Sequence, residues 1–301
     1  MRQHAAEALG QIGNPKAVAP LIALLQDSQG DMRQAAAEAL GRLGDSRALQ
    51  PLLRGFQGGQ GRRKDGVEDA RRATLLAYAK IGRTSAPEQT TGDIRAVFNN
   101  HAEHKRIRLA AAVALLELQP LTPPDATIMQ LLEEVYADGS QSISNRRELS
   151  DMLGEFPSEP GRQILLQLLE DTNLSVREHA IKSLGQSKAQ DILPTLHRYL
   201  EDANFRLQKA AAEALAAIAS VASIDALATR LNAGDSVSIP TRLACLQALS
   251  HIAKNPETGN DGRERIIDEM LRAAQKDEAI LGMRTYKLLG DVQARQALDQ
   301  L

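Results

Sequence analysis

A ten-residue pattern recurs along this chain at nearly regular intervals, and such a repeat limits the possible fold more than any other feature. Residues 32–41 read MRQAAAEALG, and the pattern returns as RQHAAEALG at residues 2–10 and VREHAIKSLG at residues 176–185. Aligned on the position of Arg33, the copies begin near residues 2, 33, 71, 108, 146, 177, 208, 242 and 282. The shortest spacing has room for two helices of ordinary length joined by tight turns.

Each copy is followed by a second amphipathic stretch, clearest at residues 17–25, 164–169 and 192–200, in which Leu and Ile recur at helical spacing. Strand-forming residues are sparse, with no Trp, four Phe and four Tyr. One helix pair cannot bury two apolar faces alone, so neighbouring pairs must stack. We therefore predict an all-α solenoid of about nine tandem helix pairs, forming a single array over residues 1–301.

Local signals predict where these helices end. The longer spacings indicate insertion loops near residues 57–66, 84–92, 119–125 and 255–263. A left-handed helix end is predicted at Gly13-Asn14-Pro15, with similar ends at Gly44, Gly82 and Gly154. Capping boxes are predicted at two helix starts, formed by Asp31 with Gln34 and by Ser175 with Glu178.

The recurring motifs V/M-R-x-x-A-x-x-A-L-G and A-x-x-P-L-I-x-L-L-x-D resemble those of the HEAT superfamily, particularly its short repeats of the phycobilin-lyase type. The resemblance covers essentially the whole chain. It implies the helical-repeat fold, with the second helices lining the inner curve. It does not imply one function, because arrays of this kind serve as scaffolds, adaptors, lyases and sensors.

An arginine recurs in the first turn of the predicted first helices, where a cation opposes the helix dipole. Asp27 and Asp171 each lie six residues before the next such arginine, so a carboxylate–guanidinium bridge between consecutive helices would offset that cost. We interpret these residues as a structural ladder rather than a phosphate site; its members are Arg33, Arg71, Arg108, Arg146, Arg177, Arg242, Asp27 and Asp171.

A partner protein is the predicted ligand, because stacked helix pairs present an extended surface. The formal charge of -2 provides no global field for nucleic acid, and a membrane-spanning run is absent from the sequence. Five arginines on the predicted second helices are candidate contacts for an acidic partner: Arg54, Arg95, Arg198, Arg230 and Arg272. The one cysteine suggests a reducing compartment, and cytoplasm is the predicted location.

No catalytic, cofactor-binding or metal-binding constellation stands out in the sequence, so we predict a non-enzymatic scaffold or adaptor that needs no cofactor. Cys245 aligns with small apolar residues of other repeats and is interpreted as a packing residue. Two alternatives stay open. Kinship of the repeat allows a bilin-lyase-like or hydroxylase-like enzyme, although the chain lacks the His-Glu dipeptides of the hydroxylases. The second alternative is that the chain is the sensor array of a larger signalling or defence NTPase.

The first repeat has no polar covering face. Ala5, Ala6, Leu9 and Ile12 match the internal helix around Leu40, whereas terminal repeats normally carry a polar outer face. We therefore expect the chain to be a segment of a longer protein, or another element to cover its first repeat.

Overall fold

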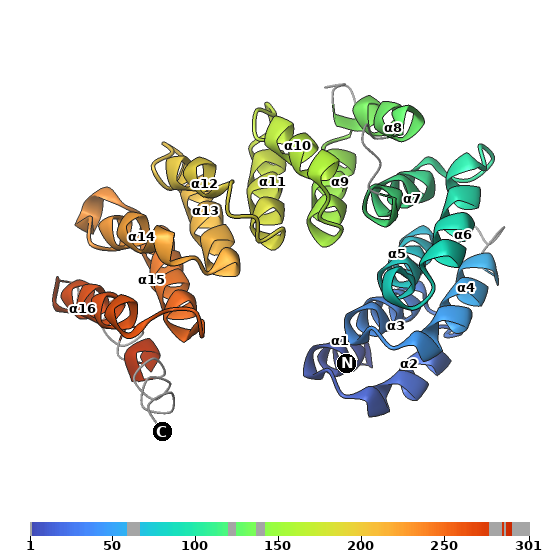
Figure 1. Cartoon of the computed structure of the whole chain (residues 1–301), viewed down its shortest axis with the longest axis horizontal. Coiled ribbons are helices and arrows are strands. Elements are labelled where there is room, and N and C mark those ends of the chain that lie inside the picture. The colour runs from blue at the N-terminus through green and yellow to red at the C-terminus, as the bar shows by residue number, and fades with distance from the viewer. Residues whose placement is uncertain are drawn as a thin grey trace. The chain divides into compact units, whose positions relative to one another are not determined.

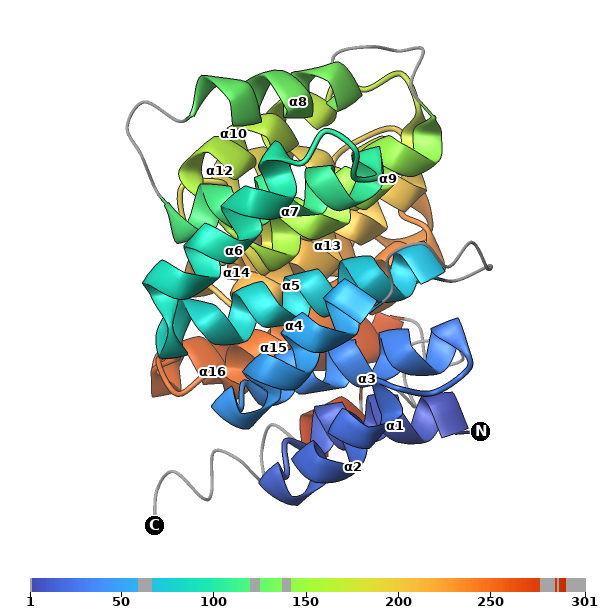
Figure 2. The ribbon, with the colours of Figure 1, turned by 90° about the vertical axis from the view of Figure 1, so that its right-hand side faces the viewer.

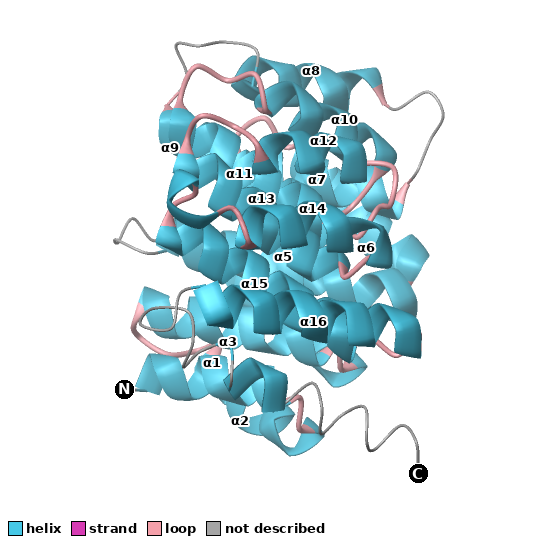
Figure 3. Ribbon diagram, turned by 90° about the vertical axis from the view of Figure 1, so that its left-hand side faces the viewer, coloured by secondary structure: helices cyan, strands magenta, loops and turns pink. Residues whose placement is uncertain are grey.

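The computed structural model describes residues 2–58, 67–119, 125–136, 142–276, 285 and 287–290. These residues form α-helices, short 3-10 helices and turns, with no strand among them (Figure 3). The chain is an all-α solenoid of helix pairs, as predicted. It comprises two compact units, residues 1–138 and 139–301.

In the first unit, first and second helices alternate along the chain (Figure 1). The first helices are α1 (Arg2–Ile12), α3 (Gly30–Leu43), α5 (Val67–Ser85) and α7 (Lys105–Leu118). The second helices are α2 (Val18–Leu24), α4 (Leu49–Gly58), α6 (Pro87–Asn99) and α8 (Ala126–Tyr136). Figure 2 shows this unit from the side on which its second helices follow one another. Two 3-10 turns, η1 (Pro15–Ala17) and η2 (Ser46–Ala48), lead into α2 and α4.

The second unit repeats this order. Its first helices are α9 (Ile143–Glu155), α11 (Leu174–Gln186), α13 (Phe205–Ile218) and α15 (Ile239–Lys254). Its second helices are α10 (Glu159–Leu168), α12 (Leu193–Leu200), α14 (Ile224–Leu231) and α16 (Asn260–Lys276), with 3-10 turns η3 (Val221–Ser223) and η4 (Gly234–Ser236). The ninth first helix, expected near residue 282, lies largely outside the described residues.

Small residues bring the first helices of neighbouring repeats into close contact. A Cβ atom on Gly185 of α11 would lie 2.5 Å from the Cα of Ala214 on α13, and one on Gly10 would lie 2.8 Å from the Cα of Ala39. The glycine that closes the recurring A-L-G motif therefore sets the distance between first helices. Within each unit the first helices lie on the inner side of the bend and the second helices on the outer side (Figure 1), which corrects the expected placement.

Two of the four predicted left-handed helix ends are confirmed and two are wrong. Gly13 and Gly44 are left-handed helix ends, with φ of 72° and 68°. Gly82 and Gly154, by contrast, lie inside α5 and α9. A Cβ on Gly154 would lie 2.9 Å from the Cα of Ser183, so this glycine allows close packing rather than a turn.

The capping boxes are not formed. The N-cap residues of α3 and α11 are Gln29 and Asn173, two residues before the predicted Asp31 and Ser175. Each helix begins two residues earlier than predicted, and at the start of α11 the Asn173 side chain accepts a hydrogen bond from the Ser175 amide.

The predicted loops are shorter where the structure describes them. The 84–92 loop is wrong: α5 continues to Ser85 and α6 begins at Pro87, which is tolerated at a helix start because proline has no amide hydrogen to leave unpaired. The 255–263 loop ends at Gly259, before α16. Most of the 57–66 and 119–125 loops lies outside the described residues.

Candidate functional site

The recurring arginines act at the end of the preceding second helix rather than in their own first turn. Arg33 Nη1 donates to the backbone oxygen of Asp27 at 2.8 Å, and Arg177 Nη1 donates to that of Asp171 at 2.7 Å. The last carbonyls of a helix lack intrahelical partners and carry its negative dipole end, so a cation is favourable there. In the repeat that begins with α13, where a glutamine stands at the arginine position, Gln208 makes the same contact with the Asp202 oxygen at 2.6 Å.

The carboxylates pair with a different arginine from the one expected. Asp171 accepts hydrogen bonds from Arg146, at 2.7 Å to Nε and 3.3 Å to Nη2, and Asp27 pairs with Arg2. Each carboxylate thus bridges back to the first helix of its own repeat. A hydrogen bond from the Gln29 amide, and then Arg2, holds the pKa of Asp27 below its usual range.

Three other ladder arginines follow the rule of Arg33 and Arg177, whereas Arg146 donates to the Asp171 carboxylate. Arg108 Nε donates to the Phe98 oxygen at 3.0 Å, and Arg242 Nε donates to the Leu231 oxygen at 3.1 Å. Arg71 donates to the Phe56 oxygen at 3.4 Å. The contacts are therefore with the carbonyl ends of α6, α14 and α4.

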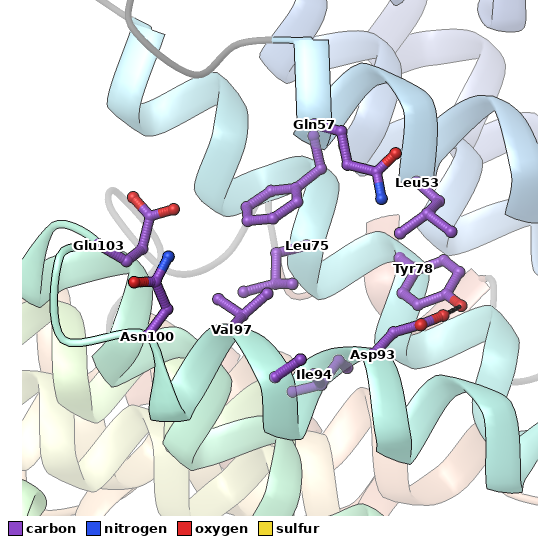
Figure 4. Close-up of a pocket in the computed structure, with 11 residues that line it drawn as sticks. Leu53, Gln57, Leu75, Tyr78, Asp93, Ile94, Val97, Asn100 and Glu103 are labelled. Atoms are coloured by element: carbon purple, nitrogen blue, oxygen red, sulfur yellow. Dashed lines mark hydrogen bonds between the residues drawn. The ribbon is translucent and has the colours of Figure 1, made fainter.

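A pocket of about 230 Å³ opens between α4 and α6, over α5, in the first unit (Figure 4). Its lining residues are Leu53, Phe56, Gln57, Leu75, Tyr78, Asp93, Ile94, Ala96, Val97, Asn100 and Glu103. The middle of the pocket is apolar, with Tyr78 and Asp93 at one end and Asn100 and Glu103 at the other (Figure 4).

The two ends of the pocket differ in charge. At one end Glu103 receives hydrogen bonds of 2.8 Å from both Nη1 and Nη2 of Arg71, and this bidentate contact holds the pKa of Glu103 below its usual range. The Arg71 guanidinium also lies over the Phe56 ring, 4.6 Å from its centre. At the other end the Tyr78 hydroxyl donates to Asp93 Oδ2 at 2.5 Å. Burial, with a contribution from Asp93, raises the pKa of Tyr78 to about 12.

The second unit carries a regular row of apolar side chains at the starts of its first helices, a feature that the sequence interpretation missed. Ile143, Phe205 and Ile239 are the first residues of α9, α13 and α15, and their exposed fractions are 45%, 52% and 41%. Leu174, half-buried, holds the same position in α11. We call these four residues the apolar row.

Hydrogen bonds link the start of α13 to the start of α15 and to α11, so three of the four row positions lie on neighbouring, linked helices. The Thr241 hydroxyl, in the first turn of α15, donates to the Phe205 oxygen at 3.4 Å. Arg206 Nη2, in the first turn of α13, donates to Glu178 of α11 at 2.6 Å. Each row residue lies three positions before the ladder position of its repeat, and this spacing is the signal by which the sequence could have revealed the row.

The five candidate contact arginines all lie on second helices, two in the first unit and three in the second. Arg54 of α4 and Arg198 of α12 are exposed, and Arg198 lies over the Tyr199 ring. Arg230 of α14 is half-buried. The other two form internal ion pairs, Arg95 with Asp125 at 2.6 Å and Arg272 with Glu269 at 2.8 Å.

Cys245 is fully buried in α15, and burial raises the pKa of its thiol to about 12. The thiolate is the reactive form of cysteine. At pH 8 such a pKa leaves about one thiol in 10,000 ionised. We expect the native chain to be inert to the thiol reagent DTNB and the urea-denatured chain to release one equivalent. Rapid reaction of the native chain would show that Cys245 is accessible.

The described residues contain no group of three or more His, Cys, Asp or Glu side chains arranged to hold a metal ion. Among the same residues, every helix is too short or too polar to cross a membrane.

Stacked helix pairs with closely packed first helices define this molecule as an α-solenoid repeat protein. The family model for HEAT repeats matches residues 1–70 and 162–250, which is more than half of the chain. The chain belongs to the HEAT-repeat family. Comparison with curated proteins gives no significant match.

Solved structures of similar fold include three proteins with different printed descriptions. The complex of CpcE and CpcF of phycocyanin lyase from Nostoc sp. PCC7120 is similar at 20% identity and a TM-score of 0.48, over 84% of this chain and 93% of that chain. Human deoxyhypusine hydroxylase in complex with glycerol is similar at 18% identity and a TM-score of 0.35, over 96% of this chain and 88% of that chain. Kap121p is similar at 15% identity and a TM-score of 0.42, over 91% of this chain and 37% of that chain. At these identities and TM-scores the likeness says nothing about activity or partner.

Proposed function

We propose that this chain is a non-enzymatic scaffold or adaptor that binds a partner protein, and that the apolar row of the second unit is part of the contact surface. The observation that carries the proposal is the repeated exposure of large apolar side chains at one position of successive repeats. Scattered exposed apolar residues are ordinary, whereas a contiguous set is typical of an interaction site.

The ladder residues support the helix stack in this proposal and do not contact the partner. Their side chains are engaged with helix ends and with carboxylates of the same chain. The five arginines of the second helices remain proposed contacts for an acidic partner. Of these, Arg54, Arg198 and Arg272 are exposed, while Arg95 and Arg272 would have to exchange an ion pair within the chain for one with the partner.

The double variant Phe205→Ser/Ile239→Ser tests the apolar row. Both side chains are exposed, so serine should leave the fold intact, while each lost interface side chain should weaken binding by about 1.5 kcal/mol or more, and the pair by about a hundredfold. Val221→Ser is a matched control, because Val221 is 50% exposed but lies beyond the opposite end of α13.

The measurement is quantitative affinity capture by the full chain, followed by a titration with each purified partner. Circular dichroism confirms that all three proteins are folded. We expect the wild type and Val221→Ser to bind the same partner equally and the double variant to lose it. Equal binding by all three proteins would remove the apolar row from the interface, and the absence of any saturable protein partner would contradict the proposed function.

A further inference from the structure

The pocket between α4 and α6 has an unbalanced charge. Glu103 at one end is paired with Arg71 through two hydrogen bonds. Asp93 at the other end accepts a hydrogen bond from the neutral Tyr78 hydroxyl, and among the described residues it has no cationic partner. The net charge of the pocket is therefore that of the Asp93 carboxylate.

The walls beside Asp93 are apolar. Ile94 and Leu75 are buried, and Leu53 and Val97 are half-buried, so their side chains line an apolar channel that leads to the carboxylate. A carboxylate at the end of such a channel suits a group with an aliphatic stem and a cationic head. Lysine and arginine side chains have this construction.

A bare metal ion fits the pocket poorly. Calcium and magnesium take six or more oxygen ligands, whereas this end offers the Asp93 carboxylate and the Tyr78 hydroxyl among hydrocarbon walls. The pocket rim suits a peptide better, since Asn100 at the opposite end and Gln57 beside Leu53 are exposed amides that can bind a peptide backbone (Figure 4).

We propose that this pocket binds a lysine or arginine side chain of a partner protein, with the cationic head on Asp93 and the stem against Leu53, Ile94 and Val97. The inference rests on the proposed function in one respect only, that the cation is carried by a protein. The pocket lies in the first unit and the apolar row in the second, so the two sites are tested by separate variants.

The test follows the methyl signals of Leu53, Ile94 and Val97 by NMR while the full chain is titrated with small probes. The probes are the capped tripeptides acetyl-Gly-Arg-Gly-amide and acetyl-Gly-Lys-Gly-amide, the neutral tripeptide with citrulline in place of arginine, and the free amine agmatine. Citrulline keeps the shape of arginine and removes its charge. We expect saturable shifts with at least one cationic tripeptide and at least tenfold weaker binding of the citrulline tripeptide.

Two variants assign the binding to Asp93. Asp93→Asn removes the charge but keeps an acceptor for the Tyr78 hydroxyl, and it should weaken cationic tripeptide binding at least tenfold. Glu88→Gln is the matched control, because Glu88 is an exposed carboxylate on the same helix and does not line the pocket. It should bind like the wild type.

Several results would overturn the inference. Equal binding of the arginine and citrulline tripeptides, or unchanged binding by Asp93→Asn, would show that the charge of Asp93 is not used. Binding of agmatine without binding of either tripeptide would make the pocket a site for free amines and would refute the peptide assignment. None of these results bears on the apolar row, so a failure here is distinguishable from a failure of the proposed function.

Discussion

Replacing Arg71 by methionine is expected to lower the free energy of unfolding by about 3–5 kcal/mol, the largest effect of any ladder substitution in the first unit. Arg71 is 8% exposed and its partner Glu103 has a side chain of similar burial. Methionine preserves much of the packing against Phe56 but leaves the Glu103 carboxylate buried without its cation. The loss comes mainly from that uncompensated charge.

Urea unfolding followed by circular dichroism measures this effect, and Arg33→Met is the graded comparison. Arg33 is half-buried and donates to backbone oxygens at 2.8 and 3.2 Å, with no carboxylate bond. The Arg33→Met substitution should lower the free energy of unfolding by about 1–2 kcal/mol. The double variant Arg71→Met/Glu103→Leu should recover much of the loss because no buried charge is then left alone. Similar losses for Arg71→Met and Arg33→Met would contradict the assigned role of the Glu103 bridge.

Replacing Gly185 by alanine is expected to destabilise the second unit by about 1–3 kcal/mol, the range of an overpacked core. The new Cβ would lie 2.5 Å from the Cα and 2.9 Å from the oxygen of Ala214. Because these are backbone atoms, no side-chain rotation relieves the overlap, and α11 and α13 must move apart. The higher helix propensity of alanine offsets only about 1 kcal/mol of this cost.

Gly92→Ala is the control of opposite sign. Gly92 lies inside α6, and a Cβ there would meet nothing within 4 Å. Alanine should therefore stabilise the chain by up to about 1 kcal/mol through helix propensity alone. Thermal and urea unfolding of both variants provide the comparison. If Gly185→Ala also stabilised the chain, the close approach of α11 and α13 would be wrong.

Much of the fold could be predicted from local signals. The repeat located the first helices that the structure describes to within a few residues, and the apolar spacing located the second helices. The left-handed ends at Gly13 and Gly44 followed from a glycine at the end of each recurring first-helix pattern, reinforced at Gly13 by Pro15. Predictions for Gly82 and Gly154 were wrong because the same residue type also serves where two helices touch, and a single sequence does not separate these uses.

The candidate sites were less accessible to sequence reasoning. The apolar row had a signal, an apolar residue three positions before each ladder residue of the second unit, but its exposure depends on how far each helix start projects from the stack. The pocket had no sequence signal. Tyr78 and Asp93 come from different helices, and the space that they border depends on the distance between α4 and α6.

The amino-acid sequence by itself determined the helix pairs, their order and the small residues at which first helices meet, since these depend on short-range periodicity and residue size. Only the tertiary structure decided which charges pair. Asp171 lies six residues before Arg177, yet its carboxylate binds Arg146, 25 residues away, while Arg177 takes the free carbonyl of the helix end. The reason is physical: the unpaired carbonyls at the end of a helix attract the nearest cation, and the stacking of helices then brings the carboxylate to the arginine on its other side.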